Sequence, residues 1–97
     1  MKVILLNSAE EDLVDAWHFY DDQEPGVGEY YYDEVMTAVR SLSTQHGLHP
    51  KKGQFFRALV PKFHTAIYYT LETDFVLVRR ILDLRRDPKW LRRHLRD

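Results

Sequence analysis

The spacing of apolar residues changes once along the chain, near residue 50, and this change limits the possible folds more than any other feature. Before it, apolar side chains recur at the spacing of an amphipathic helix, as Leu13, Ala16, Trp17 and Tyr20 do. After it, they form short runs rich in β-branched and aromatic residues, which is typical of strands. A chain with helices first and strands later is predicted to be an α+β protein.

Two helices are predicted in the first half. Ser8 and Glu11 have capping-box spacing, so the first helix should begin with Ser8 as its N-cap. The Pro-Gly-Val-Gly segment at 25–28 ends that helix. A second helical stripe then runs to about residue 45 and contains Tyr31, Val35, Ala38, Val39 and Leu42. Because the connecting turn is short, the helices should form an antiparallel hairpin.

Four strands and a final helix complete the prediction. The strands are expected at Lys2–Asn7, Phe55–Val60, Phe63–Leu71 and Phe75–Leu82. Pro88 after Asp87 indicates the start of a last short helix. The order is therefore β-α-α-β-β-β in a single domain over residues 1–97, with the helical hairpin packed on one face of a small, mainly antiparallel sheet. The other face should be solvated or covered by a partner.

Several classes of site and location are disfavoured by composition. Cysteine is absent, which excludes disulfides and thiolate metal sites. The histidines have no metal-ligand spacing, so we expect no metal and no other cofactor. The N-terminal apolar run has four residues, whereas a signal peptide needs about 7–15 and a membrane helix about 20. We therefore expect a cytoplasmic protein that does not associate with membranes.

The net charge of −1 conceals a strong asymmetry. Residues 1–50 contain two basic and ten acidic residues, a balance of −8, and residues 51–97 contain twelve basic and five acidic residues, a balance of +7. Either the basic half faces an anionic partner, or the two halves neutralise each other across the fold. The sequence leaves both interpretations open.

Three segments together resemble the ParE/RelE superfamily of toxins. The first runs from Ala9-x-x-Asp12-Leu13 through Phe19-Tyr20 to the Pro-Gly-Val-Gly-Glu-Tyr turn at 25–30. The second is Lys-Phe-His-Thr-Ala-Ile-Tyr-Tyr at 62–69, where His64 and Thr65 depart from the family strand. The third is Arg-Arg-Asp-Pro-x-Trp-x-x-Arg at 85–93. The resemblance extends over nearly the whole chain and implies a RelE/ParE-like fold.

The resemblance also implies a type II toxin neutralised by a cognate antitoxin, with the complex binding its own operator. We expect no direct DNA binding by this chain without the antitoxin. RelE-like members cleave messenger RNA on the ribosome, but the arginine and histidine that they often carry correspond here to Ala66 and Asp83. No tyrosine lies in the C-terminal tail, so no catalytic residue is assigned. ParE-like inhibition of DNA gyrase is favoured, and a ribosome-dependent ribonuclease or a non-toxic regulatory relative remains as the alternative.

Two sets of candidate binding residues follow. Those expected to contact the target are Arg57, Arg80, Arg85, Arg86, Trp90 and Arg93. Those expected to form an apolar surface that the antitoxin covers are Tyr30, Tyr31, Phe55, Phe56 and Tyr68. For Arg80, Arg85 and Arg86, pairing with acidic residues of the fold is the competing interpretation. For Arg57 and Arg93 it is a solvated position, and for Trp90 it is packing.

Overall fold

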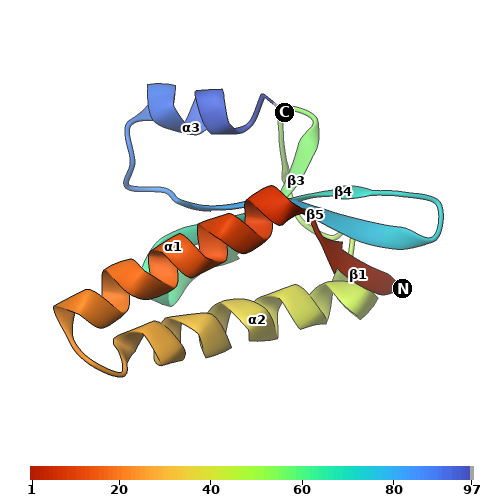
Figure 1. The fold of residues 1–97 in the computed structure, drawn as a ribbon. Coiled ribbons are helices and arrows are strands. Elements are labelled where there is room, and N and C mark those ends of the chain that lie inside the picture. The colour runs from red at the N-terminus through yellow and green to blue at the C-terminus, as the bar shows by residue number, and fades with distance from the viewer. Residues whose placement is uncertain (97) are drawn as a thin grey trace.

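A computed structural model describes residues 1–96 and has three layers (Figure 1). A hairpin of two long helices lies on one side of a sheet, and a short C-terminal helix lies on the other. The elements in chain order are β1 (Lys2–Leu5), α1 (Asn7–Gln23), α2 (Val27–Gln45), β2 (Lys51–Lys52), β3 (Phe55–Val60), the 3-10 turn η1 (Pro61–Phe63), β4 (Thr65–Leu71), β5 (Phe75–Asp83) and α3 (Pro88–His94). The α+β class and the helical hairpin are confirmed.

The turn between α1 and α2 brings these helices very close together. Gly26 has a φ of 96°, a left-handed conformation that favours glycine, and its N–H donates to Asp21 Oδ1 at 2.9 Å. A Cβ at Gly28 would lie 2.6 Å from the carbonyl oxygen of Trp17. Glycine at position 28 therefore lets α2 begin in contact with α1.

The sheet has the strand order β1-β5-β4-β3-β2. β1 runs parallel to β5, and the other neighbouring pairs are antiparallel. β1 pairs with β5 only as far as Val78, so the beginning of α1 covers the edge of β5 beyond that residue. There the Ser8 hydroxyl donates to the carbonyl oxygen of Arg79 at 3.1 Å. The prediction that Ser8 caps α1 is therefore wrong: the helix begins at Asn7, and Ser8 ties it to the sheet.

Two apolar cores form, one on each face of the sheet. The hairpin-side core contains residues of both helices and of the four longer strands, including Leu13, Tyr31, Val35, Leu42, Ile67, Tyr69, Val76 and Ile81. On the other face, buried Phe55, Ala66, Tyr68 and Leu82 pack against Leu84, Trp90, Leu91 and Leu95. The chain itself thus covers much of the face that was expected to be solvated or covered by a partner.

The predicted strand boundaries shift at three places. The first strand ends at Leu5 instead of Asn7. The strand predicted from Phe63 begins at Thr65, because Pro61–Phe63 form a 3-10 turn and His64 has a φ of 48°. A two-residue strand, Lys51–Lys52, lies in the segment predicted as a loop. None of the helices within residues 1–96 has the length and apolar composition of a membrane span.

Candidate functional site

The opposite charges of the two halves lie on opposite sides of the sheet. Residues 7–45, which form the helical hairpin, contain ten acidic residues and one basic residue. Residues 85–96, here called the C-terminal arm, contain six basic residues and one acidic residue. In the described part of the chain, the ion pairs between the acidic first half and the basic second half are Lys62–Glu34 and Arg80–Asp12. Most of the charge is therefore not neutralised within the fold.

Arg80 links α1, β5 and the C-terminal arm. Its guanidinium donates to both carboxylate oxygens of Asp12, at 2.8 and 2.7 Å, and to the carbonyl oxygen of His94 at 3.0 Å. Asp12 also accepts the backbone N–H of Ile81 at 3.0 Å. Both charged side chains are mostly buried, with 16% and 11% of their surface exposed. The structure thus gives Arg80 an internal structural partner.

Trp90 anchors the C-terminal arm on the second core. The guanidinium of Arg86 lies 3.9 Å from the centre of one Trp90 ring, and the His94 ring is stacked on Trp90 with centroids 3.8 Å apart. α3 begins with Pro88, and the Asp87 side chain caps it by accepting the N–H of Lys89 at 2.8 Å. The predicted helix start at Asp87-Pro88 is confirmed, and Trp90 has the packing role that was weighed against target binding.

Arg85 ties the start of the arm to α1. Its guanidinium donates to Asp83 Oδ2 at 2.7 Å and to the Tyr20 hydroxyl at 2.9 Å. Burial alone would raise the pKa of the Asp83 carboxyl, but the hydrogen bonds and charge of Arg85 outweigh burial and hold that pKa below its ordinary value. Asp83 is therefore ionised at neutral pH and paired with the Arg85 guanidinium. A general acid must carry a proton, so Asp83 does not suit that role.

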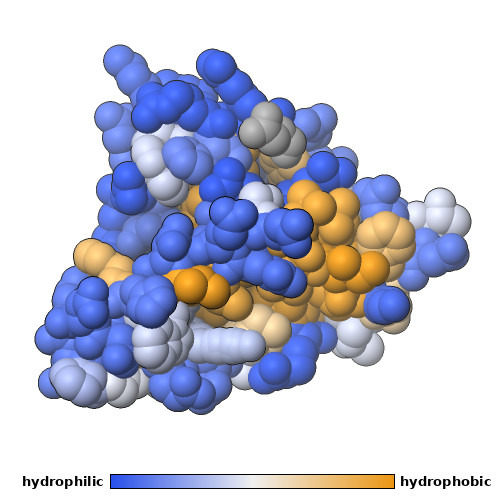
Figure 2. Space-filling model, viewed as in Figure 1, coloured by the Kyte–Doolittle hydropathy of each residue, from blue (hydrophilic) through white to orange (hydrophobic). Residues whose placement is uncertain are grey.

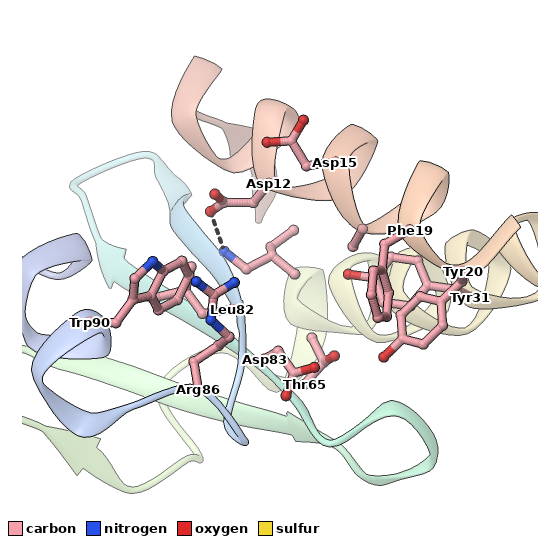
Figure 3. Close-up of a pocket in the computed structure, with 12 residues that line it drawn as sticks. Asp12, Asp15, Phe19, Tyr20, Tyr31, Thr65, Leu82, Asp83, Arg86 and Trp90 are labelled. Carbon is pink, nitrogen blue, oxygen red and sulfur yellow. Dashed lines mark hydrogen bonds between the residues drawn. The ribbon is translucent and has the colours of Figure 1, made fainter. Parts of the chain in front are cut away.

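A pocket of about 290 Å³ lies between α1 and the start of the arm (Figure 3). Phe19, Tyr20 and Tyr31 line one side, and Arg86 and Trp90 lie on the opposite side. Burial raises the pKa of Tyr31, and it also raises that of Tyr20 although Arg85 acts in the opposite direction. Both tyrosines are therefore neutral at pH 7, and neither is suited to act as a general base.

The nuclease positions do not form a reactive set. Ala66 is completely buried beneath the arm, and Asp83 is paired with Arg85. Arg57 lies opposite Tyr68 in the strand register, and Tyr68 is 1% exposed. Burial raises the pKa of Tyr68, although the neighbouring Arg57 guanidinium lowers it. The Tyr68 hydroxyl thus cannot reach an RNA 2′-oxygen in this conformation. Residues 1–96 also contain no cluster of metal-ligating side chains.

The residues expected to bind the antitoxin do not share one surface. Tyr31 and Tyr68 are buried in cores on opposite faces of the sheet, and Phe55 is also buried. Tyr30 is exposed beside Lys62, and Phe56 is half-buried beneath Lys51. Exposed apolar surface lies instead over β1 and the β4–β5 hairpin, where Figure 2 shows a continuous apolar area. Ile4 and Leu71 are 36% and 40% exposed there.

The exposed cations of the arm remain available for contact with another molecule. Arg86, Arg92, Arg93 and Arg96 are exposed, together with Lys89. Of the six predicted target-binding residues, Arg85, Arg86, Trp90 and Arg93 lie in the C-terminal arm, and Arg80 contacts the arm at the carbonyl oxygen of His94. Arg57 lies opposite Tyr68 in the strand register, and Tyr68 lies opposite Arg80. Sequence analysis did not identify Asp12 as a partner of the arm. Its place in the Ala9-x-x-Asp12-Leu13 segment was the one available signal.

The helical hairpin on one face of the sheet and the short helix on the other define a small α+β domain with a ParE/RelE-like fold. A chain from the structure described as the chromosomal ParDE TA system from P. aeruginosa superposes with a TM-score of 0.75, covering 84% of this chain and 92% of that one. Sequence identity between them is 12%, so the likeness concerns the fold. No family model and no curated protein matches the sequence.

Proposed function

We propose that this chain is the toxin of a type II toxin–antitoxin pair and that it arrests growth by binding DNA gyrase. The observation that carries the proposal is the shared fold with a ParDE chain over 84% of the sequence. The unneutralised basic arm supports action through contact with a macromolecule, because a surface of one charge sign favours a partner of the opposite sign.

An inhibitory role is favoured over ribonuclease action because the positions that correspond to the RelE nuclease residues, Ala66 and Asp83, do not supply a general acid and base. Ribonucleolytic cleavage needs a base near the 2′-hydroxyl and an acid near the leaving oxygen. Tyr31 and Tyr68 are buried and Tyr20 is half-buried, and the pKa of each is raised, so all three are neutral at pH 7. Asp83 is paired with Arg85. A binding protein needs none of these groups.

The antitoxin has a suitable place at β1. This strand is at the edge of the sheet, and within residues 1–96 it has no strand neighbour on its outer side, where an added strand would pair. The apolar side chains of Ile4 and Leu71 are exposed beside it, and Leu77, which pairs with Ile4, is half-buried. An extended antitoxin segment with apolar side chains would pair with the edge of β1 and cover the exposed apolar side chains beside it. Tyr30 and Phe56 are also partly exposed and could contact other parts of the antitoxin.

The test is induced expression of the chain alone in a bacterial host, with parallel measurement of the DNA-damage response and of translation. Growth arrest with DNA damage and continued early translation is expected. Prompt loss of translation without DNA damage would instead identify a ribonuclease, and normal growth would indicate a non-toxic relative. Purified chain should also increase gyrase-mediated DNA cleavage in vitro.

A charge-matched pair of variants tests whether the arm makes the contact. Arg92→Glu with Arg93→Glu should abolish arrest and gyrase inhibition, because both side chains are exposed on α3. Lys2→Glu with Lys52→Glu makes the same change in net charge at exposed sites outside the arm and should leave arrest intact. Equal loss in both variants would show that net charge, rather than the arm, is responsible.

A further inference from the structure

The outer face of α3 carries a row of cations. Lys89, Arg92 and Arg93 have i, i+3 and i+4 spacing, which puts them on one side of the helix, and Arg96 follows two residues after the helix ends. All four side chains are exposed. Within residues 1–96, none of them takes part in a salt bridge. These four residues, here called the cationic stripe, therefore form a surface of uncompensated positive charge.

The rest of α3 holds the cationic stripe in a fixed position. Leu91 and Leu95 pack in the second core, and Asp87 caps the first turn. Arg80 donates to the carbonyl oxygen of His94 at 3.0 Å, which ties the last turn to β5. The cations therefore project from a helix that is anchored at both ends, and this reduces the entropy lost when they bind a partner.

The cationic stripe offers charge without apolar anchors, because Trp90, Leu91 and Leu95 pack towards the sheet. Protein interfaces depend on apolar or aromatic anchors near their centre, and helices that lie on membranes insert apolar side chains. Single-stranded nucleic acids stack their bases on exposed rings, but the Trp90 rings already contact Arg86 and His94. The remaining partner is the phosphate backbone of a nucleic acid duplex, which lysine and arginine bind without apolar contacts.

We propose that the cationic stripe of α3 binds the phosphate backbone of duplex DNA. The choice of DNA rests on the proposed function, because gyrase acts on duplex DNA and an arm in contact with gyrase would meet it. Lys89 and Arg96 are seven residues apart, about 10 Å at the rise of a helix, and this length covers about three phosphates of one DNA strand. Phosphate contacts carry no sequence information, so duplexes of any sequence should bind alike. The inference departs from the expectation that the chain does not bind DNA without its antitoxin.

The acidic helical hairpin would orient the chain on DNA. It contains ten acidic residues and one basic residue, and it packs on the face of the sheet opposite α3 (Figure 1). DNA is repelled by the first face and attracted by the second, so the chain should approach a duplex with α3 foremost. The net charge of the whole chain is −1. Binding would therefore depend on where the cations lie and not on net charge.

The inference is tested by fluorescence anisotropy of a labelled DNA duplex of about 20 base pairs titrated with the full chain. Saturable binding is expected at about 50 mM salt. Affinity should fall about 60-fold between about 50 and 200 mM, because neutralising three to four phosphates gives a logarithmic salt slope of about −3. A duplex of unrelated sequence should bind within about twofold of the first. Single-stranded DNA and duplex RNA of the same length serve as competitors, and neither should compete better than the DNA duplex.

Charge-matched variants locate the binding. Arg92→Gln with Arg93→Gln should weaken binding about tenfold and reduce the steepness of the salt dependence by about two, since each lost phosphate contact reduces the slope by about one. Lys2→Gln with Arg40→Gln removes the same charge at exposed positions on β1 and α2 and should change affinity less than about threefold. All four substituted side chains are exposed, so both variants should keep the circular dichroism spectrum and urea midpoint of the parent chain.

Three results would overturn the proposal. One is the absence of saturable binding to duplex DNA at about 50 mM salt. Another is equal weakening by both charge-matched pairs, which would assign the attraction to net charge, and the third is better competition by single-stranded DNA or duplex RNA. The assay contains neither gyrase nor host cells. Growth arrest by a chain that does not bind DNA would therefore refute this inference alone, and DNA binding by a chain that does not arrest growth would refute only the proposed function.

Discussion

Replacing Asp12 by alanine should destabilise the protein strongly, because this carboxylate holds three parts of the fold together. It accepts two hydrogen bonds from Arg80 and one from the backbone of Ile81, and Arg80 in turn contacts the carbonyl oxygen of His94. The substitution leaves a mostly buried guanidinium without its carboxylate and an N–H at the sheet edge without its acceptor.

The expected loss can be estimated from this geometry. Removing one partner of a buried ion pair lowers the free energy of unfolding by about 3–5 kcal/mol. Because the two side chains retain 16% and 11% exposure, the lower end, about 3 kcal/mol, applies. The higher helix propensity of alanine returns about 0.5 kcal/mol. A net loss of about 2.5 kcal/mol is a large fraction of the total stability of about 5–15 kcal/mol of a small domain.

Urea unfolding followed by circular dichroism and tryptophan fluorescence measures this loss. Glu11→Ala, an exposed neighbour on the same helix, is the matched control and should change stability by less than about 0.5 kcal/mol. Combining Asp12→Ala with Arg80→Met should show a coupling energy of about 2 kcal/mol between the two sites. A loss below about 1 kcal/mol, or additive effects in the double variant, would refute the reasoning.

Three further substitutions test other parts of the structure. Gly28→Ala should lower stability by about 2–3 kcal/mol in thermal unfolding, because its Cβ would lie 2.6 Å from a carbonyl oxygen of α1; an unchanged Tm would contradict the close helix contact. Tyr69→Phe removes a buried hydroxyl that accepts the Gly47 N–H and bonds His49 at 2.6 Å, so hydrogen exchange in residues 46–49 should accelerate. Asp83→Asn should destabilise the protein at neutral pH, but the difference should vanish in acid. The folded-state pKa of this carboxyl is lowered, so its contribution is present above the unfolded-state pKa and is lost as pH falls through the folded-state pKa. A difference that persists in acid would show that the charge of Asp83 is not responsible.

Elements with regular spacing were predictable from the sequence alone. The apolar stripes of both helices, the Pro-Gly-Val-Gly break and the Asp87-Pro88 helix start are local signals, and each corresponds to an observed element. Strand ends were predicted less well. Phe63 looks like a strand residue, but Pro61 and the left-handed His64 place it in a 3-10 turn, from which its ring packs against Tyr30 and Tyr31.

The candidate site depended much more on long-range contacts. The basic character of the C-terminal arm was readable from composition, but whether its cations faced the acidic helices was not. The structure packs α3 on the opposite face of the sheet from the hairpin, but it brings the start of the arm close to α1. Within residues 1–96, the ion pairs between the two halves are Lys62–Glu34 and Arg80–Asp12. The two residues of the Arg80–Asp12 pair are 68 positions apart, so no local pattern could reveal their pairing.

The sequence by itself therefore determined the class of fold, the helical hairpin and the asymmetry of charge, since each arises from residue type and short-range spacing. Tertiary structure decided which aromatic residues were buried, as Tyr31 and Tyr68 show. The alternation of side chains along a strand assigns Tyr68 to one face of the sheet, but it does not show that α3 covers that face. Tertiary structure also decided that Arg80 and Arg85 have internal partners, whereas Arg92 and Arg93 remain exposed. These distinctions depend on contacts between residues that are far apart in the sequence. Such contacts cannot be predicted from the local spacing of residue types.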